Sequence, residues 1–198
     1  MKVLNISKHL GIAAILFSAV LVSCNSSSET DVTSDSDSIA VTENQSDAAQ
    51  SATAVISGTY SDTSLTGSAT FSQSNGNVNL VLAVTAPAKA NKSVAVHLHE
   101  HGDCGDMGKE AHGHWNPTNK EHGKWGEGNF HSGDIGNVQL DADGHGTLTI
   151  DSNIWTIGGD STTNILNKAV IVHGGVDDYT TQPTGNAGNR IGCGVITN

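Results

Sequence analysis

Apolar and polar residues alternate with a period of two in many short segments of this chain, and this pattern most constrains its fold. Segments of this kind that are rich in β-branched residues are typical of β-strands. Strands are expected at 65–73, 78–85, 94–100, 136–140, 146–150, 154–157, 169–173 and 191–196. Asn75-Gly76 between the first two indicates a tight hairpin turn. No long helix is indicated, so the sequence predicts an all-β fold, an antiparallel sandwich or barrel.

Two long segments, 101–133 and 174–190, do not show this alternation. Loops of this length without secondary structure are uncommon in compact domains unless they are functional. Many of the residues with chemically useful side chains lie in these two segments or at their edges. The sequence therefore predicts a sheet with two long functional loops folded over it.

Residues 1–23 have the features of a secretion signal. Lys2 and Lys8 precede an apolar run that is too short to span a membrane comfortably. The run ends in Leu-Val-Ser-Cys, which resembles a bacterial lipobox, so Cys24 is expected to carry the lipid (palmitate) and to become the mature N-terminus. Asn25 in place of an aspartate favours the outer membrane over the inner one. The alternative is an ordinary signal peptide with a chance cysteine.

The next segment, 24–53, is rich in serine and acidic residues and has no lysine or arginine. Low hydrophobicity with one sign of charge predicts a flexible tether. The remainder, 54–198, has a length that suits one domain. Acidic residues outnumber basic ones there, in a chain of net charge −11. This balance argues against a nucleic-acid partner, which requires basic patches.

Two cysteines, Cys104 and Cys193, remain once Cys24 is assigned to the lipid. A pair of cysteines in an exported protein is expected to form a disulfide. The bridge would join the first long loop to the last predicted strand.

Six of the ten histidines and one aspartate form the strongest chemical pattern in the chain: His97, His99, His114, His122, His131, His173 and Asp134. Neutral imidazole is a common metal ligand. Residues two apart on a strand face the same way, so His97 and His99 are expected side by side, with Val94, Val96 and Leu98 facing the core. This pair alone is equally consistent with a structural or surface role.

The remaining members of the set sharpen the prediction. Three histidines and one carboxylate, His114, His122, His131 and Asp134, make a closed set of the kind that binds structural zinc. Four nitrogens suit copper(II), and they would come from His97, His99, His173 and one imidazole shared with the zinc set. The pattern predicts two metal sites with one common ligand.

Several motifs together resemble the copper/zinc superoxide dismutase family. They include His97-Leu98-His99-Glu100, Gly113-His114-Trp115-Asn116-Pro117, His131-Ser132-Gly133-Asp134 and Asn189-Arg190-Ile191-Gly192-Cys193. The resemblance covers nearly all of 54–198. It implies a Greek-key antiparallel β-sandwich or barrel, with copper and zinc as cofactors and superoxide as the substrate that is converted to oxygen and hydrogen peroxide.

The resemblance also implies roles for single residues. His97, His99, His114 and His173 match the copper ligands, and His114, His122, His131 and Asp134 match the zinc ligands. His114 would then be a bridging imidazolate and a catalytic proton carrier. Asp177 matches the aspartate that ties a copper ligand to a zinc ligand. Arg190, the only arginine of the chain, matches the catalytic arginine that orients a small anion.

The location follows from the predicted lipid anchor: the cell envelope, as a periplasmic or surface lipoprotein.

The subloop around Asp106 and Met107 varies within the family and often relates to dimer contacts, so a homodimer is an open expectation. His101, His112 and His145 have no ligand role in the family and are expected to be surface groups. A non-enzymatic copper- and zinc-binding lipoprotein is the alternative. A cupin-type metalloenzyme would leave Asp134, Asp177 and the cysteine pair unexplained.

Overall fold

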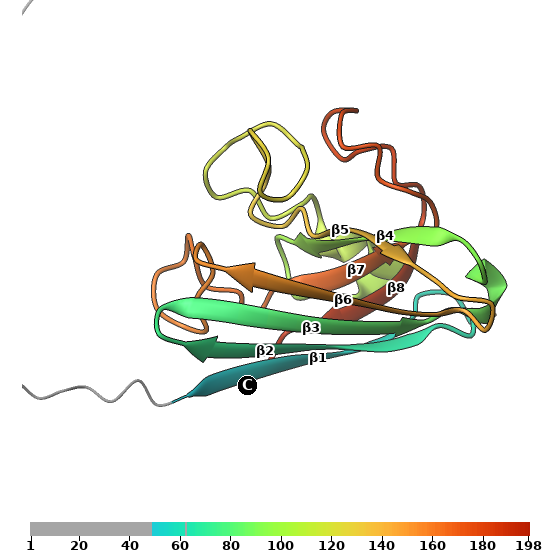
Figure 1. Ribbon diagram of the computed structural model, residues 1–198, viewed down its shortest axis with the longest axis horizontal. Helices are drawn as coiled ribbons and strands as arrows, with labels where there is room; N and C mark the ends of the chain where they lie inside the picture. Colours follow the sequence, from blue (N-terminus) through green and yellow to red (C-terminus); the bar gives the residue numbers. More distant parts are fainter. Residues whose placement is uncertain (1–48, 62) are drawn as a thin grey trace, which may run out of the picture. The chain divides into compact units, whose positions relative to one another are not determined.

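The fold is an eight-stranded antiparallel sheet that curls into a nearly closed barrel (Figure 1). The computed structural model describes residues 49–61 and 63–198. The strands are β1 (Gln50–Gly58), β2 (Thr66–Ser74), β3 (Asn77–Thr85), β4 (Ser93–His99), β5 (Gly136–Gln139), β6 (His145–Ser152), β7 (Ala169–His173) and β8 (Arg190–Val195). The short helical segments are η1 (Pro87–Lys89), α1 (Gly105–Gly108) and η2 (Lys109–Ala111). The predicted all-β class is confirmed.

The strand order, β5-β4-β7-β8-β1-β2-β3-β6, divides the sheet into two halves. Strands β1 to β3 form a meander, the chain then crosses to β4 and β5, and it returns to pair β6 with β3. This is the expected Greek-key arrangement. In Figure 1 the halves lie one behind the other, and the two long loops extend beyond the half that contains β4 and β5.

The core lies between the two halves and is built from the inward-facing side chains of both. Its largest fully buried members include Phe71, Leu80, Leu82, Leu98, Trp155, Ile165 and Ile196. Val94, Val96 and Leu98 of β4 face this core and are fully buried, as the alternation predicted. Burial of these apolar side chains is the main favourable contribution to folding.

Strand β4 is buried on both faces, which is unusual for a strand of an antiparallel barrel. Its outward-facing residues, Ala95, His97 and His99, are as buried as its core residues. Strand β7 pairs with it, His97 opposite Ile171, and is also buried throughout. The outer face of this half is therefore covered by the long loops, which creates a second, polar interior outside the barrel.

The structure differs from the sequence prediction in two elements. Strand β1 begins at Gln50. The segment Gln50–Thr53, which was predicted to be part of the tether, therefore belongs to the sheet and pairs with β2. The buried positions of this strand include Ala52 and Ala54, whose small side chains give a weak alternation signal. The expected strand at 154–157 forms only an isolated bridge between Thr156 and Asn164. Its apolar residues, Trp155 and Ile157, instead pack into the hydrophobic core from this irregular segment.

The predicted signal peptide, the predicted lipidation site at Cys24 and the part of the predicted tether before residue 49 lie outside the described residues. Within the described part of the chain, no helix has the length and apolar character needed to cross a membrane.

Candidate metal centre

Backbone hydrogen bonds bring the first long loop onto the outer face of β4. Trp115 N–H donates to the carbonyl of Leu98 (2.8 Å), and Leu98 N–H donates to the carbonyl of Gly133 (2.9 Å). A Cβ at position 133 would lie 2.2 Å from the Leu98 oxygen, so only glycine allows this close approach. The pairing places His114 and Asp134, the neighbours of Trp115 and Gly133, beside the β4 histidines.

Four buried imidazoles form the first cluster: His97 and His99 from β4, His173 from the end of β7, and His114 from the loop. One ring nitrogen of each lies within 4.8 Å of those of the others. The Nε2 atoms of His99 and His173 are 3.3 Å apart, and the ring centroids of His97 and His114 are 4.0 Å apart. This is the set that the sequence assigned to copper.

The outer nitrogens of these rings are held by hydrogen bonds. The His99 Nδ1–H donates to the carbonyl of His112 (2.8 Å), and the His173 Nδ1–H donates to that of Gly188 (3.2 Å). The Nε2–H of His97 donates to Asp177 Oδ2 (2.8 Å). Since a neutral imidazole has one N–H and one lone pair, the inner nitrogens are left as lone-pair donors that face one another.

The second cluster surrounds the fully buried carboxylate of Asp134. The Nδ1 atoms of His114, His122 and His131 lie 2.8, 3.0 and 3.2 Å from its oxygens. The backbone N–H groups of Gly123 and His131 donate to Oδ2 and fix the carboxylate. Three imidazole nitrogens and one carboxylate therefore converge as a tetrahedral zinc site requires.

Buried nitrogens without partners show that these clusters fit metal ions. Among the described residues, four buried side-chain nitrogens have no hydrogen-bond partner: His97 Nδ1, His114 Nε2, His122 Nδ1 and His131 Nδ1. Buried polar atoms are almost always hydrogen-bonded. All four face the interior of the two clusters, and a bound cation at each would satisfy them.

Asp177 connects the two clusters. Its Oδ2 accepts the hydrogen bond from His97, and its Oδ1 accepts one from His122 Nε2 (2.9 Å). The residue is 1% exposed, whereas neighbouring Asp178 is exposed and caps a turn. The structure thus separates two aspartates that composition alone could not distinguish.

Gly185 and Asn137 also support Asp177, and sequence reasoning missed both. A Cβ at Gly185 would lie 1.8 Å from Asp177 Oδ1, and φ there is +67°. Asn137 on β5 exchanges hydrogen bonds with Asp177, because its Nδ2 donates to the backbone carbonyl and its Oδ1 accepts from the backbone N–H. Neither residue carries a local sequence signal, since Asn137 acts on a segment far along the chain and Gly185 contributes only the absence of a side chain.

Burial and charge set opposite protonation states for the imidazoles of the first cluster and for His122 of the second. Burial lowers the pKa of His114 to about 4 and that of His173 to about 3, and it also lowers the pKa values of His97 and His99. At His122 burial acts the same way, but the adjacent carboxylates of Asp134 and Asp177 outweigh it and raise the pKa to about 9. The first cluster therefore stays neutral at pH 7 and offers free lone pairs.

These shifts predict how the stability of the metal-free domain depends on pH. Below about pH 6.5 the unfolded chain binds protons that the folded first cluster refuses. Stability should therefore fall as the pH drops from 6.5 towards 4, by about 1.4 kcal/mol per pH unit for each such proton. His122 acts oppositely, and its contribution is lost as the pH rises through 9. Denaturant titrations at several pH values should give a maximum near neutrality; stability that is flat from pH 7 to 4.5 would contradict the shifts.

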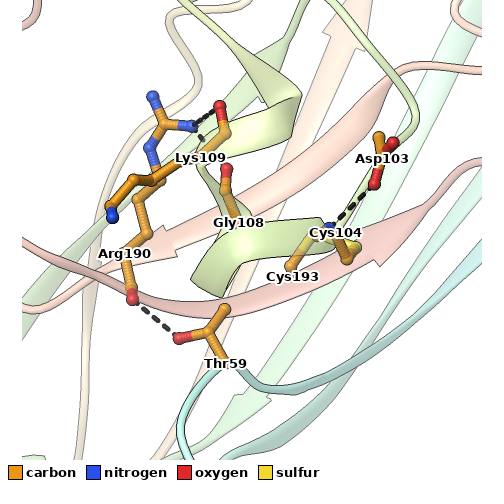
Figure 2. The surroundings of a disulfide bond; sticks show 8 residues. Thr59, Asp103, Cys104, Gly108, Lys109, Arg190 and Cys193 are labelled. Carbon is orange, nitrogen blue, oxygen red and sulfur yellow. Dashed lines mark hydrogen bonds between the residues drawn. A yellow bond between two sulfur atoms is a disulfide. The ribbon is translucent and has the colours of Figure 1, made fainter.

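Arg190 and the disulfide lie beside the first cluster. Cys104 and Cys193 form the predicted bridge, which joins the 104–111 segment to β8 (Figure 2). The half-buried guanidinium of Arg190 donates to the carbonyls of Gly108, Lys109 and His112. Its positive charge contributes to the lowered pKa values of His99 and His173. The arginine is thus held next to the imidazoles by the segment that the disulfide secures.

Comparisons with known proteins agree with this geometry. A family model described as copper/zinc superoxide dismutase matches residues 65–196. Cu-Zn superoxide dismutase 5 of Dictyostelium discoideum is 38% identical over 106 residues, which are 50% of this chain and 68% of that protein. Cu-Zn superoxide dismutase 1 of Aquifex aeolicus is 36% identical over 104 residues, 50% of this chain and 62% of that protein.

A solved structure shows the same fold. The crystal structure of the clock protein EA4 superposes with a TM-score of 0.66 at 32% identity, over 75% of this chain and 94% of that one. The fold, the two ligand clusters and the family match point to one conclusion. This chain belongs to the copper/zinc superoxide dismutase family of oxidoreductases, whose cofactors are copper and zinc.

Proposed function

We propose that this protein converts superoxide to oxygen and hydrogen peroxide at a copper ion and a zinc ion that share His114 as an imidazolate bridge. The copper would be held by His97, His99, His114 and His173, and the zinc by His114, His122, His131 and Asp134. His114 carries the proposal, because its Nδ1 lies 2.8 Å from Asp134 while its buried Nε2 lacks a hydrogen-bond partner. His114 is also a member of both ligand clusters.

Bound copper supplies one-electron redox chemistry, and bound zinc supplies a fixed positive charge without changing its oxidation state. His114 would supply the proton. A neutral imidazole has one lone pair, so serving both sites requires that it lose its second proton. With copper bound, the Nε2 of His114 would be one of its ligands, and as an N–H group the same atom would donate a proton to the peroxide product. Its low pKa, about 4, shows that the buried ring does not hold an extra proton at neutral pH.

Arg190 would attract and orient the superoxide anion. The chain is acidic overall, so a fixed cation beside the copper ligands matters for the encounter. Arg190→Ala should lower kcat/KM by about 10-fold or more while leaving metal content unchanged, since charge at a site mouth changes association rates by 10 to 1,000-fold. Arg190→Lys should keep part of the kcat/KM that Arg190→Ala loses, and its kcat/KM should still depend on ionic strength. Equal rates for wild type and Arg190→Ala at low salt would remove the arginine from the mechanism.

Metal analysis with an activity assay tests the proposed function. The purified domain should contain about one copper and one zinc per chain, as the two ligand sets imply, and it should dismute superoxide. The same preparation after removal of copper should be inactive. Full copper occupancy without activity would instead favour a non-enzymatic copper- and zinc-binding protein.

We also propose that the enzyme acts in the cell envelope, where it would remove superoxide formed outside the cytoplasm. The secretion signal and the Leu-Val-Ser-Cys run that ends at Cys24 support this proposal, as does the disulfide, which persists in oxidising compartments. Labelled palmitate should appear in the full-length protein and be lost in Cys24→Ala, which should also leave the membrane fraction. Label that persists in Cys24→Ala would refute lipidation at this residue.

A further inference from the structure

A third group of potential metal ligands lies outside the two buried clusters. It consists of Glu100, His101 and His112, and one ligand atom of each lies within 4.8 Å of the others. The rings of His101 and His112 meet at an angle of 74° with centroids 4.5 Å apart. All three residues are exposed. From sequence the two histidines were expected to be surface groups, and the fold also brings them together.

Backbone pairing creates this group. The segment after β4 pairs with residues 111–113, at the end of the segment that the disulfide joins to β8. Glu100 N–H donates to Gly113 O (3.0 Å), and His101 N–H donates to Ala111 O (3.2 Å). His112 therefore lies across from Glu100 and His101. Since the pairing depends on main-chain atoms, it persists when the side chains are changed.

The backbone of His112 is held in a strained conformation. Its φ of 61° and ψ of −141° lie close to a region that is occupied almost only by glycine. The conformation is fixed from both sides: His112 N–H donates to Lys109 O, and its carbonyl accepts hydrogen bonds from His99 Nδ1 and Arg190. The surface group is thus attached directly to a ligand of the first cluster and to the active-site arginine.

The side chains are free to bind an ion. Within the described residues, no ion pair involves the Glu100 carboxylate; Lys168 Nζ donates to the backbone oxygen of Glu100 instead. Two imidazoles and one carboxylate, exposed to water, leave coordination positions open for solvent. Among divalent first-row metals, a mixed nitrogen and oxygen set binds copper(II) most strongly.

We propose that Glu100, His101 and His112 form a third, solvent-open site that binds copper(II) and delivers it to the neighbouring buried cluster. Binding at this site depends only on the three side chains. The delivery role rests on the proposed function, since it requires that the cluster of His97, His99, His114 and His173 take copper. The two parts are therefore tested separately.

Binding is tested on the holoenzyme, with both buried sites filled. Copper(II) added to the wild type should occupy one further site, with an electron paramagnetic resonance spectrum distinct from that of the buried copper. The double variant Glu100→Gln/His101→Ala should bind this additional copper at least 10-fold more weakly by calorimetry. His145→Ala, which removes another exposed histidine, is the matched control and should bind like the wild type. Equal affinity in the double variant and the wild type would overturn the site.

Delivery is tested on metal-free protein at substoichiometric copper(II). The absorbance of the buried copper should appear several-fold more slowly in the double variant than in the wild type and His145→Ala, with the same final amplitude. Equal rates with a lost third site would overturn delivery and leave the binding site standing. Failure of all three proteins to load the buried cluster would count against the proposed function instead, because third-site binding is measured independently.

Discussion

His114→Ala is expected to abolish dismutation and to weaken the binding of both metals. The side chain is 1% exposed, and His114 is a member of both ligand clusters. Losing even a supporting contact to a metal ligand typically costs 10- to 100-fold in affinity, so losing a ligand shared by two sites should cost at least about 100-fold at each. The measurement is copper and zinc content after dialysis, together with the copper spectrum.

The matched comparison is His131→Ala. This ring belongs only to the second cluster, where its Nδ1 lies 3.2 Å from Asp134. Its removal should mainly lose zinc and leave the copper ligands complete. A His114→Ala protein that keeps a wild-type copper spectrum while His131→Ala behaves as expected would show that His114 does not bridge the sites.

The metal ligands of this protein could be predicted from its sequence more completely than its strands and supporting residues. Alternation on β4 correctly placed Val96 and Leu98 in the core and His97 and His99 on the other face, because the period of a strand is a local property. The seven predicted ligands also converge in the structure. Their convergence could be predicted because the motifs that contain them resemble those of a known metal-binding family.

Long-range support was not predictable in the same way. Strand β1 was missed because its buried positions include Ala52 and Ala54, and small residues signal burial weakly. Gly185 contributes only the absence of a side chain beside Asp177. The cluster of Glu100 with His101 and His112 depends on pairing between two loop segments, and no periodicity records such a pairing.

Replacing both cysteines, Cys104→Ser/Cys193→Ser, is expected to lower stability and activity through separate effects. The bridge closes a loop with a sequence separation of 89, and the chain-entropy model gives roughly 4 to 5 kcal/mol for a loop of this size. Chemical denaturation of the oxidised wild type and the variant measures this loss. An unchanged denaturation midpoint would contradict it.

The effect on activity should act through Arg190. The bridge holds the subloop whose carbonyls at Gly108 and His112 accept hydrogen bonds from the guanidinium, and its other end lies on β8, three residues after the arginine. Without the bridge, the subloop can move away from β8 and leave the guanidinium without a fixed position. At a temperature where the variant is still folded and metal-loaded, kcat/KM should therefore fall towards that of Arg190→Ala. Combining the changes should then add little, because two changes that act through one group are not additive. A combined variant whose loss equals the product of the separate losses would show that the disulfide influences catalysis by a route other than the arginine.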